Sequence, residues 1–321
     1  MMSISNALVS FPINGMVISL CTLSFLIVWV ATPIIRRLGV HYNIGDAPGH
    51  RKVHAKMIPT MGGIGLYLAF SMCAVLGLGF SEQLLYILFA AGILLGIGIL
   101  DDLKDSSPFL KFFGQCIVAI ITVHAGIKID VVSNVFGTGV LSLSNLSIPL
   151  SILWILTLIN MMNFIDGIDG LAAGLAGISS FFLAIIAISQ EQWAAAILAS
   201  IVMGMSFGFL RFNFYPAKIF MGDSGSMLLG YFLAVITIIG ALKSTFIISF
   251  SIPMLILGIP LFDIAWAIFR RLKNGTAIYL PDRAHIHHQL LDHGLNHAQV
   301  SLLLYSINIG LGVLALVLFT L

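Results

Sequence analysis

Residues 148–170 read IPLSILWILTLINMMNFIDGIDG, and this stretch decides what kind of protein the chain forms. It begins as an apolar run almost as long as a membrane-crossing helix, which needs about 20 mainly apolar residues. It ends in two amides, two carboxylates and two glycines, a group that solvation alone does not explain. The stretch therefore predicts a helix in lipid whose end carries a functional loop.

The composition of the whole chain also favours lipid as the solvent. Hydrophobic residues make up 59% of the 321 positions and charged residues 9%, whereas charged residues are about 25% of a typical soluble domain. A mean hydropathy of +1.08 leaves too little polar surface to coat a soluble globule. The net charge of +2, without a basic patch that interleaves aromatics, argues against nucleic-acid binding.

Ten apolar segments follow one another along the chain, and we expect an all-α polytopic membrane protein with about ten transmembrane helices. Backbone polar groups in lipid must be satisfied within the structure, so apolar runs of this length are helical. No internal repeat is visible, so we expect a single domain over 1–321. The first segment lacks the positive start of a signal peptide and is expected to be retained. The segments are 14–35, 61–80, 83–100, 109–126, 148–164, 171–189, 192–211, 226–242, 246–269 and 300–320.

Charged residues are distributed unevenly between the two sides that alternating spans define. One side holds 13 of the 15 Lys and Arg residues, ten of the 13 acids and eight of the nine His residues. The positive-inside rule makes that side cytoplasmic and, with ten spans, puts both termini outside. Acids and histidines need not obey the rule, so we interpret the five loops of this face as an active site. They are 36–60, 101–108, 165–170, 212–225 and 270–299.

The outer segment 127–147 differs in character from the other outer connections. Ile127, Ile129 and Val131 alternate with other residues, and Gly137-Thr138-Gly139 offers a turn before a second apolar stretch. This pattern predicts a short periplasmic β-hairpin that acts as a structural cap.

The second cytoplasmic loop opens with Asp101 and Asp102, directly after an apolar run. Two adjacent carboxylates at a helix end repel each other and are costly near lipid. A metal ion or a cationic neighbour would compensate them, and a solvated helix boundary is the structural alternative.

The third loop carries Asn160 and Asn163 on one helix face, and Asp166 and Asp169 repeat the spacing of three. Oxygen donors of this kind suit Mg²⁺ or Mn²⁺ and the hydroxyls of a sugar or ribose. In the fourth loop, small residues surround Asp223 at the start of a helix. They offer N–H groups for a phosphate and a carboxylate for a metal, or simply an N-cap.

The last loop contains His285, His287 and His288 without the Cys partners or the HExxH frame of a zinc site. Imidazoles beside guanidinium groups would hold diphosphate oxygens, and a solvated loop is the alternative. In the first loop, Arg51 and Lys52 belong to a basic run, for which attraction to anionic lipid headgroups is the simpler explanation.

Together these motifs resemble the polyprenyl-phosphate N-acetylhexosamine-1-phosphate transferase family over nearly the whole chain. Asp101-Asp102, the block 160–170 and Met221–Ser226 are similar to motifs of the whole superfamily, which includes the phospho-MurNAc-pentapeptide transferases. His-Ile-His-His at 285–288, after Asp282-Arg283, resembles the WecA/TagO-type branch and not the His-His-His-Phe-Glu pattern of the pentapeptide enzymes.

The resemblance implies an enzyme that moves N-acetylhexosamine 1-phosphate, most often GlcNAc 1-phosphate, from a UDP-sugar to undecaprenyl phosphate. UMP would be released, and a cell-envelope glycan would be initiated at the bacterial cytoplasmic membrane, among membrane lipids. The implied cofactor is Mg²⁺, with Mn²⁺ as an alternative. The resemblance leaves open the identity of the UDP-N-acetylhexosamine, the downstream glycan, a covalent aspartyl intermediate and the formation of a homodimer.

The resemblance also implies roles for the polar loop residues. Two residues would bind the metal, namely Asp223 and Asn163. The residues along the sugar nucleotide would be Asp166, Asp169, Phe220 (stacked on uracil), Arg271, His285, His287 and His288. The residues at the acceptor phosphate would be Asp101 and Asp102, with Arg51 and Lys52 receiving the lipid phosphate.

Two mechanistic hypotheses follow from elementary chemistry. The second pKa of a phosphate monoester is about 6, so the acceptor phosphate is already a nucleophile at neutral pH. Asp101 and Asp102 are therefore expected to position the acceptor more than to abstract a proton. Pro253 and Pro260 remove helix hydrogen bonds from the ninth segment, and we expect the resulting bend to open a groove for the polyprenyl chain.

Two other classes of membrane protein are weaker alternatives. Acids inside a membrane often mark the ion pathway of a transporter, but here they cluster at span ends, with Asp263 the deepest, and no inverted repeat is visible. A CDP-alcohol phosphotransferase needs an Ala-Arg pair after its Asp-Gly, whereas Asp169-Gly170 is followed by Leu-Ala-Ala-Gly.

Overall fold

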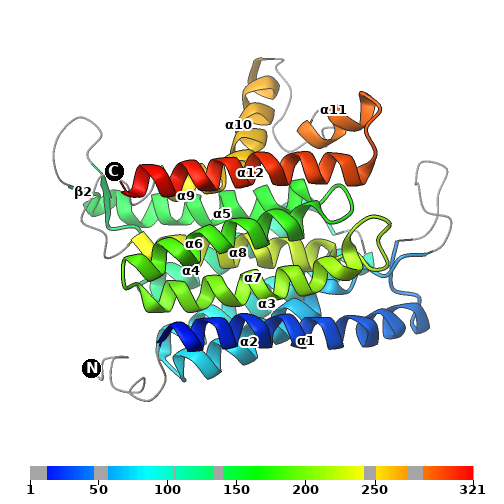
Figure 1. Cartoon of the computed structure of the whole chain (residues 1–321), viewed down its shortest axis with the longest axis horizontal. Coiled ribbons are helices and arrows are strands. Elements are labelled where there is room, and N and C mark those ends of the chain that lie inside the picture. Colours follow the sequence, from blue (N-terminus) through cyan, green and yellow to red (C-terminus); the bar gives the residue numbers. More distant parts are fainter. Residues whose placement is uncertain are drawn as a thin grey trace.

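The computed structural model describes residues 13–46, 57–104, 106–133, 140–241, 251–273 and 285–320. This part of the chain is helical apart from two short strands, and its long helices lie side by side in one bundle (Figure 1). The helices are α1 (Ile13–His41), α2 (Gly62–Leu78), α3 (Glu82–Lys104), α4 (Pro108–His124), α5 (Ser147–Ile165), α6 (Leu171–Ser189), α7 (Trp193–Asn213), α8 (Gly222–Ala241), α9 (Ser251–Ile256), α10 (Gly258–Lys273), α11 (Ile286–Asp292) and α12 (His297–Thr320).

The helices coincide closely with the apolar segments expected from the sequence. Within the described residues, seven are long and apolar enough to cross a membrane, namely α1, α3, α5, α6, α7, α8 and α12. Two shorter apolar helices, α2 and α4, match two further segments. The chain is therefore a multi-pass, helical membrane protein.

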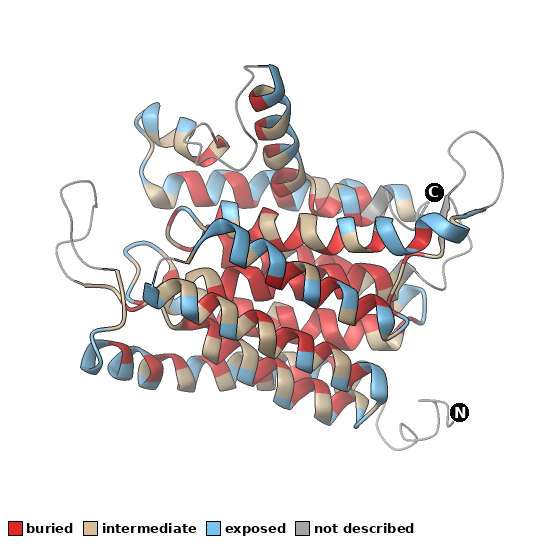
Figure 2. Ribbon diagram, turned by 180° about the vertical axis from the view of Figure 1, so that it is seen from behind, coloured by how far each residue is buried: buried red, intermediate tan, exposed pale blue. Residues whose placement is uncertain are grey.

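The ninth apolar segment forms two helices instead of one bent helix. α9 ends at Ile256 and α10 begins at Gly258. Pro260 lacks an N–H group, so it cannot bond to the carbonyl of Ile256, but it fits well in the first turn of a new helix. α10 consequently leaves the bundle at a steep angle to α12, as both Figure 1 and Figure 2 show. The break lies where the missing hydrogen bond would be.

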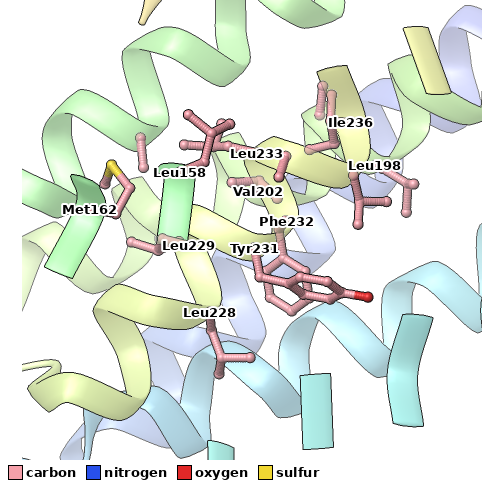
Figure 3. Close-up of a cluster of buried hydrophobic side chains, with 14 of the residues drawn as sticks. Leu158, Met162, Leu198, Val202, Leu228, Leu229, Tyr231, Phe232, Leu233 and Ile236 are labelled. Carbon is pink, nitrogen blue, oxygen red and sulfur yellow. The ribbon is translucent and has the colours of Figure 1, made fainter. Parts of the chain in front are cut away.

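The core of the bundle is built around α8. In the apolar stretch of α8, 83% of the residues are buried, whereas in those of α1 and α12 only 28% are. Buried residues accordingly occupy the interior of the bundle and exposed residues its outer faces (Figure 2). Figure 3 shows part of this core, where α8 packs against α5 and α7. The labelled residues are Leu158, Met162, Leu198, Val202, Leu228, Leu229, Tyr231, Phe232, Leu233 and Ile236.

Glycines allow two helices to come very close to the start of α8. A Cβ atom on Gly98 of α3 would lie 2.2 Å from the Cα of Ser224, and one on Gly63 of α2 would lie 2.5 Å from the Oγ of Ser224. Small residues permit such backbone contact between membrane helices. This packing brings the polar end of α3 against the polar start of α8.

The predicted hairpin is present as two paired strands. β1 (Val131–Ser133) runs antiparallel to β2 (Val140–Ser142), with Val131 opposite Ser142. The backbone N–H of Leu143 donates to the carbonyl of Asp130 at 2.9 Å and continues the ladder. The expected turn at Gly137-Thr138-Gly139 lies outside the described residues.

Candidate active site

A cavity of about 1070 Å³ lies where α3 and α5 end and α8 begins. The motifs predicted from four separate loops converge on it. The expected site residues that line the cavity are Asp101, Asp102, Asn163, Asp166, Asp169, Phe220, Asp223 and His288. Arg51 and Lys52, together with Asp282 and Arg283, lie outside the described residues.

Asp102 is bound to the start of α8. Its Oδ1 accepts a hydrogen bond from the backbone N–H of Asp223 at 2.9 Å, and its Oδ2 accepts one from Ser224 Oγ at 3.1 Å. Asp102 thus caps α8 from a different helix, which suits the positive end of the helix dipole. Gly222 has a φ of 68°, and a Cβ atom there would lie 2.4 Å from Asp102 Oδ2. Only glycine satisfies both constraints without strain.

Lys111 of α4 is the cationic neighbour that the paired carboxylates required. Its Nζ lies 2.8 Å from Asp101 Oδ2 and also contacts the carboxylate of Asp223. The other oxygen of Asp101 accepts hydrogen bonds from the N–H and the hydroxyl of Ser106, at 2.9 and 2.6 Å. Lys111 was not among the residues predicted for the site, although a single Lys within an apolar helix is itself a signal of function.

Asn163 joins the third motif to the fourth. Its Nδ2 donates to Asp223 Oδ1 and to Ser226 Oγ, both at 3.0 Å. Both N–H groups of the amide are used in these hydrogen bonds. The carbonyl oxygen Oδ1 is therefore the atom of this side chain that is left to bind a metal ion.

The donor set around Asp223 suits a hard divalent cation that keeps most of its own water ligands. Within the described residues, no group of three or more His, Cys, Asp or Glu side chains has metal-binding spacing. Mg²⁺ is commonly bound through one or two carboxylates plus substrate phosphates instead of an all-protein cage. The Asp223 carboxylate and the Asn163 carboxamide fit that mode of binding.

Asp166 and Asp169 sit on the turn between α5 and α6. Desolvation, together with the nearby carboxylates of Asp223, Asp102 and Asp169, raises the pKa of Asp166 well above its usual value. The Asp169 carboxylate, in contrast, is held by the backbone, because its Oδ2 accepts a hydrogen bond from the N–H of Ala217 at 2.8 Å. Asp166 faces the cavity with excess negative charge around it, whereas Asp169 also anchors the segment before α8.

Phe220 is fixed to the cavity wall by its backbone. Its N–H donates to the carbonyl of Pro59 at 2.8 Å, and its carbonyl accepts from the N–H of Gly62 at 3.1 Å. The aromatic ring therefore stands on a rigid segment, as a stacking surface requires.

Only one of the three predicted histidines lines the cavity. His288 does so, whereas His285 is buried against Asp263 and His287 is 1% exposed. Burial and the nearby His288 lower the pKa of His287 to about 4, so this imidazole is neutral at pH 7. Arg271 is buried on α10 and does not line the cavity. The substrate contacts expected for Arg271, His285 and His287 stay predictions.

Asn213 is a further cavity residue that the sequence did not single out. It is 2% exposed, and its Nδ2 donates to the carbonyl of Ile219 at 3.0 Å. Its Oδ1 is buried without a hydrogen-bond partner among the described residues. A buried acceptor left unpaired at a cavity wall calls for a donor from a ligand or water. The only sequence signal was a polar side chain at the end of an apolar run.

Comparison with known proteins identifies similar chains along nearly the whole length. The family model for glycosyl transferase family 4 matches residues 84–241. A protein of Bacillus subtilis (strain 168), named probable undecaprenyl-phosphate N-acetylglucosaminyl 1-phosphate transferase, is 40% identical over 92% of this chain and 83% of its own length. The undecaprenyl-phosphate alpha-N-acetylglucosaminyl 1-phosphate transferase of Haemophilus influenzae is 34% identical, with coverages of 88% and 81%. The decaprenyl-phosphate N-acetylglucosaminephosphotransferase of Mycobacterium leprae is 31% identical, with coverages of 87% and 78%.

Proposed function

This chain belongs to glycosyl transferase family 4, among the polyprenyl-phosphate N-acetylhexosamine-1-phosphate transferases, and from that premise we propose its reaction. It transfers N-acetylglucosamine 1-phosphate from UDP-N-acetylglucosamine to undecaprenyl phosphate and releases UMP. The observation that carries the proposal is a cavity on which the aspartates of three motifs converge, together with His288 of a fourth. Transport loses its main support, because Asp263, the deepest acid, is paired with His285 and does not line the cavity.

The proposed orientation has ten spans, with the cavity at the cytoplasmic face of the bacterial inner membrane. The uneven distribution of Lys and Arg supports it through the positive-inside rule. The paired strands lie at the opposite end of the bundle from the C-terminal end of α1, which agrees with a periplasmic hairpin (Figure 1). A soluble sugar nucleotide would then reach the cavity from the cytoplasm, and the lipid would reach it from the bilayer.

The cavity contains the groups that such a reaction needs. Its volume of about 1070 Å³ is slightly above the usual range for ligand pockets, about 300–1,000 Å³, and suits a large ligand such as a nucleotide sugar. Asp223 and Asn163 would hold Mg²⁺ or Mn²⁺, and the bound ion would neutralise diphosphate charge. Lys111 supplies a second positive charge at the same place.

In the proposed step, an oxygen of the acceptor phosphate attacks the β-phosphorus of the UDP-sugar. The bond from that phosphorus to the bridging oxygen breaks, and UMP leaves with the bridging oxygen. No proton has to be removed from a dianionic acceptor phosphate. Both oxygens of Asp101 and of Asp102 are already engaged as hydrogen-bond acceptors or with Lys111. Their partners support a role in positioning Lys111 and the start of α8, and argue against a general base.

The base of the nucleotide has a matching environment within the cavity. Phe220 offers a stacking surface, and Asn213 Oδ1 offers a buried acceptor that lacks a donor among the described residues. We propose that Oδ1 accepts an N–H of uracil. An unsatisfied buried acceptor favours a ligand that supplies a donor over one that does not, which would give preference for the correct base.

One assay tests the function as a whole. Membranes that contain the protein are incubated with undecaprenyl phosphate, Mg²⁺ and a panel of UDP-sugars, and UMP release is measured. We expect UDP-N-acetylglucosamine to give the fastest release, and no release without undecaprenyl phosphate. Faster release with UDP-N-acetylgalactosamine would change only the sugar, whereas no release with any UDP-sugar would overturn the proposed function.

A further inference from the structure

Asp263 on α10 is the carboxylate that lies deepest in a predicted span, and the proposed reaction does not use it. It is 4% exposed. Its Oδ2 lies 2.8 Å from His285 Nδ1, and its Oδ1 accepts a hydrogen bond from the backbone N–H of Ile286 at 2.9 Å. Both oxygens are thus engaged by two consecutive residues at the start of α11. A buried charge is tolerated only with such partners.

The pair determines how the His285 ring is oriented. A carboxylate beside Nδ1 accepts its proton and so fixes the tautomer, as carboxylates do for imidazoles that bind metals. The backbone bond from Ile286 holds the first turn of α11 at the same time. Asp263 therefore controls both the imidazole and the helix that follows it.

The orientation of His285 is passed to the cavity through a row of neighbouring aromatic rings. His285 stacks on Phe164 at 5.7 Å between ring centroids and lies parallel to His287 at 5.9 Å. The rings of His287 and His288 are tilted by 46° with their centroids 4.3 Å apart, and His288 lines the cavity. A Cβ atom on Gly167 would lie 2.4 Å from His287 Nε2, so this row of rings is pressed against the loop of the third motif.

We propose that Asp263 is a positioning residue for the sugar nucleotide, which it serves by holding His285 and the start of α11 so that His288 faces the cavity. This inference rests on the proposed function. The proposal also links α10, the helix that leaves the bundle, to the part of the active site that would bind the sugar nucleotide. Asp263 itself does not line the cavity and would not touch the substrate.

The test uses the full-length protein in membranes and compares kinetic constants for the two substrates. Asp263→Asn keeps the shape of the side chain but replaces one acceptor oxygen by a donor. We expect KM for UDP-N-acetylglucosamine to rise about tenfold, as is usual when the carboxylate partner of a functional histidine is lost. KM for undecaprenyl phosphate should stay unchanged. A purely structural role would lower the amount of active enzyme and leave both KM values alone.

A second variant tests the same contact without changing a charge. Ile286→Pro removes the N–H that Asp263 Oδ1 accepts, at the first position of α11, where proline is well tolerated. His285 already has an extended backbone, φ −65° and ψ 152°, which is compatible with a following proline. We expect a smaller rise in donor KM, of a few fold. This variant keeps the proposal testable if Asp263→Asn fails to fold.

Nitrogen-15 spectra of histidine-labelled protein supply a readout that does not depend on activity. They report which ring nitrogen is protonated, and His285→Gln identifies the signal. We expect Nδ1 of His285 to carry a proton in the wild type and to lose it partly in Asp263→Asn. Asp130→Asn is the control, because Asp130 pairs with Lys128 and Ser147 at the other end of the bundle. It should change neither the spectra nor either KM.

The possible failures are distinguishable. Wild-type donor KM in both Asp263→Asn and Ile286→Pro, or an unprotonated Nδ1 in the wild type, would overturn the role of Asp263. Absence of UMP release from the wild-type protein itself would instead overturn the proposed function.

Discussion

At the scale of single residues, Lys111 joins two motifs that are more than a hundred positions apart. Its ammonium contacts Asp101 in the last turn of α3 and Asp223 in the first turn of α8. Without this charge, two carboxylates would face each other in a partly buried site, and each would be costly to keep ionised. Lys111 therefore acts on both the geometry and the electrostatics of the cavity.

We expect Lys111→Met to lower kcat at least 100-fold, because it removes the positive charge beside Asp101 and Asp223, and loss of one electrostatic donor from an active site costs about 100- to 1000-fold in kcat. UMP release at saturating substrates measures the effect. Lys104→Met, at the exposed end of α3, is the matched control and should retain wild-type kcat. Activity of Lys111→Met within threefold of the wild type would contradict the assigned role.

The proposed role of Asn213 predicts an effect on the affinity for the sugar nucleotide instead of an effect on the rate. Asn213→Ala removes the Oδ1 atom proposed to accept from uracil, and a buried hydrogen bond is worth about 1 kcal/mol or more. We expect KM for UDP-N-acetylglucosamine to rise five- to tenfold, with KM for undecaprenyl phosphate unchanged. Asn145→Ala, at an exposed position near the hairpin, should leave both constants alone. A lower amount of active enzyme with both KM values unchanged would show that Asn213 supports the fold and not the binding of the base.

At the scale of helices, the contact between α3 and α8 decides whether the two motifs meet. Gly98→Ala would place a methyl group 2.2 Å from the Cα of Ser224, whereas a Cβ atom on Gly96 of the same helix meets nothing within 4 Å. We expect Gly98→Ala to lower the unfolding temperature and to reduce kcat at least tenfold, because close-packed helices do not accommodate an extra methyl group. Gly96→Ala should be neutral in both measurements. Equal behaviour of the two variants would argue against the close contact.

The break between α9 and α10 suggests where the polyprenyl chain of the lipid substrate binds. α10 carries Phe262, Trp266 and Phe269 on an exposed face, where successive rings stack. We propose that the space opened by the break accommodates the polyprenyl chain. Pro260→Ala restores a hydrogen bond to Ile256 and favours a continuous helix. We expect KM for undecaprenyl phosphate to rise several-fold.

The control for this prediction is another proline in the first turn of a helix. Pro149→Ala changes an exposed position of α5 at the hairpin end and should have no effect on either substrate. An unchanged KM for undecaprenyl phosphate in Pro260→Ala would count against a lipid groove at the break.

At the scale of the whole molecule, the orientation in the membrane can be tested with single cysteines. The native Cys21, Cys73 and Cys116 are free and are first replaced by Ala. A membrane-impermeant thiol reagent should label Asn145→Cys in intact spheroplasts and Lys218→Cys only in inverted vesicles. The opposite pattern would reverse the proposed topology. Labelling of both positions from one side would contradict the three spans, α5, α6 and α7, that lie between them.

Much of the site was accessible from the sequence because its chemistry is local. Asp101-Asp102, the block 160–170 and Asp223 were expected to meet, and all three contribute to one cavity, although Asn160 of the block does not line it and donates to Gln115 instead. The roles of His285 and His287 were harder to predict, because spacing within a loop does not say which imidazole faces a ligand. Their burial depends on α10 and on the position of Asp263, which the hydropathy pattern left without a role.

Sequence patterns alone predicted that the chain is a helical membrane protein, where its helices run and which loops hold the polar motifs. Hydropathy over a single segment and spacing within one turn are sufficient for these conclusions, because lipid leaves an apolar segment few alternatives to a helix. The packing of the helices, in contrast, was needed to see that Lys111 bridges Asp101 and Asp223, that Asp102 caps α8 and that Asp263 holds His285. These contacts join residues far apart in the chain, so they depend on how helices pack, which no local pattern encodes.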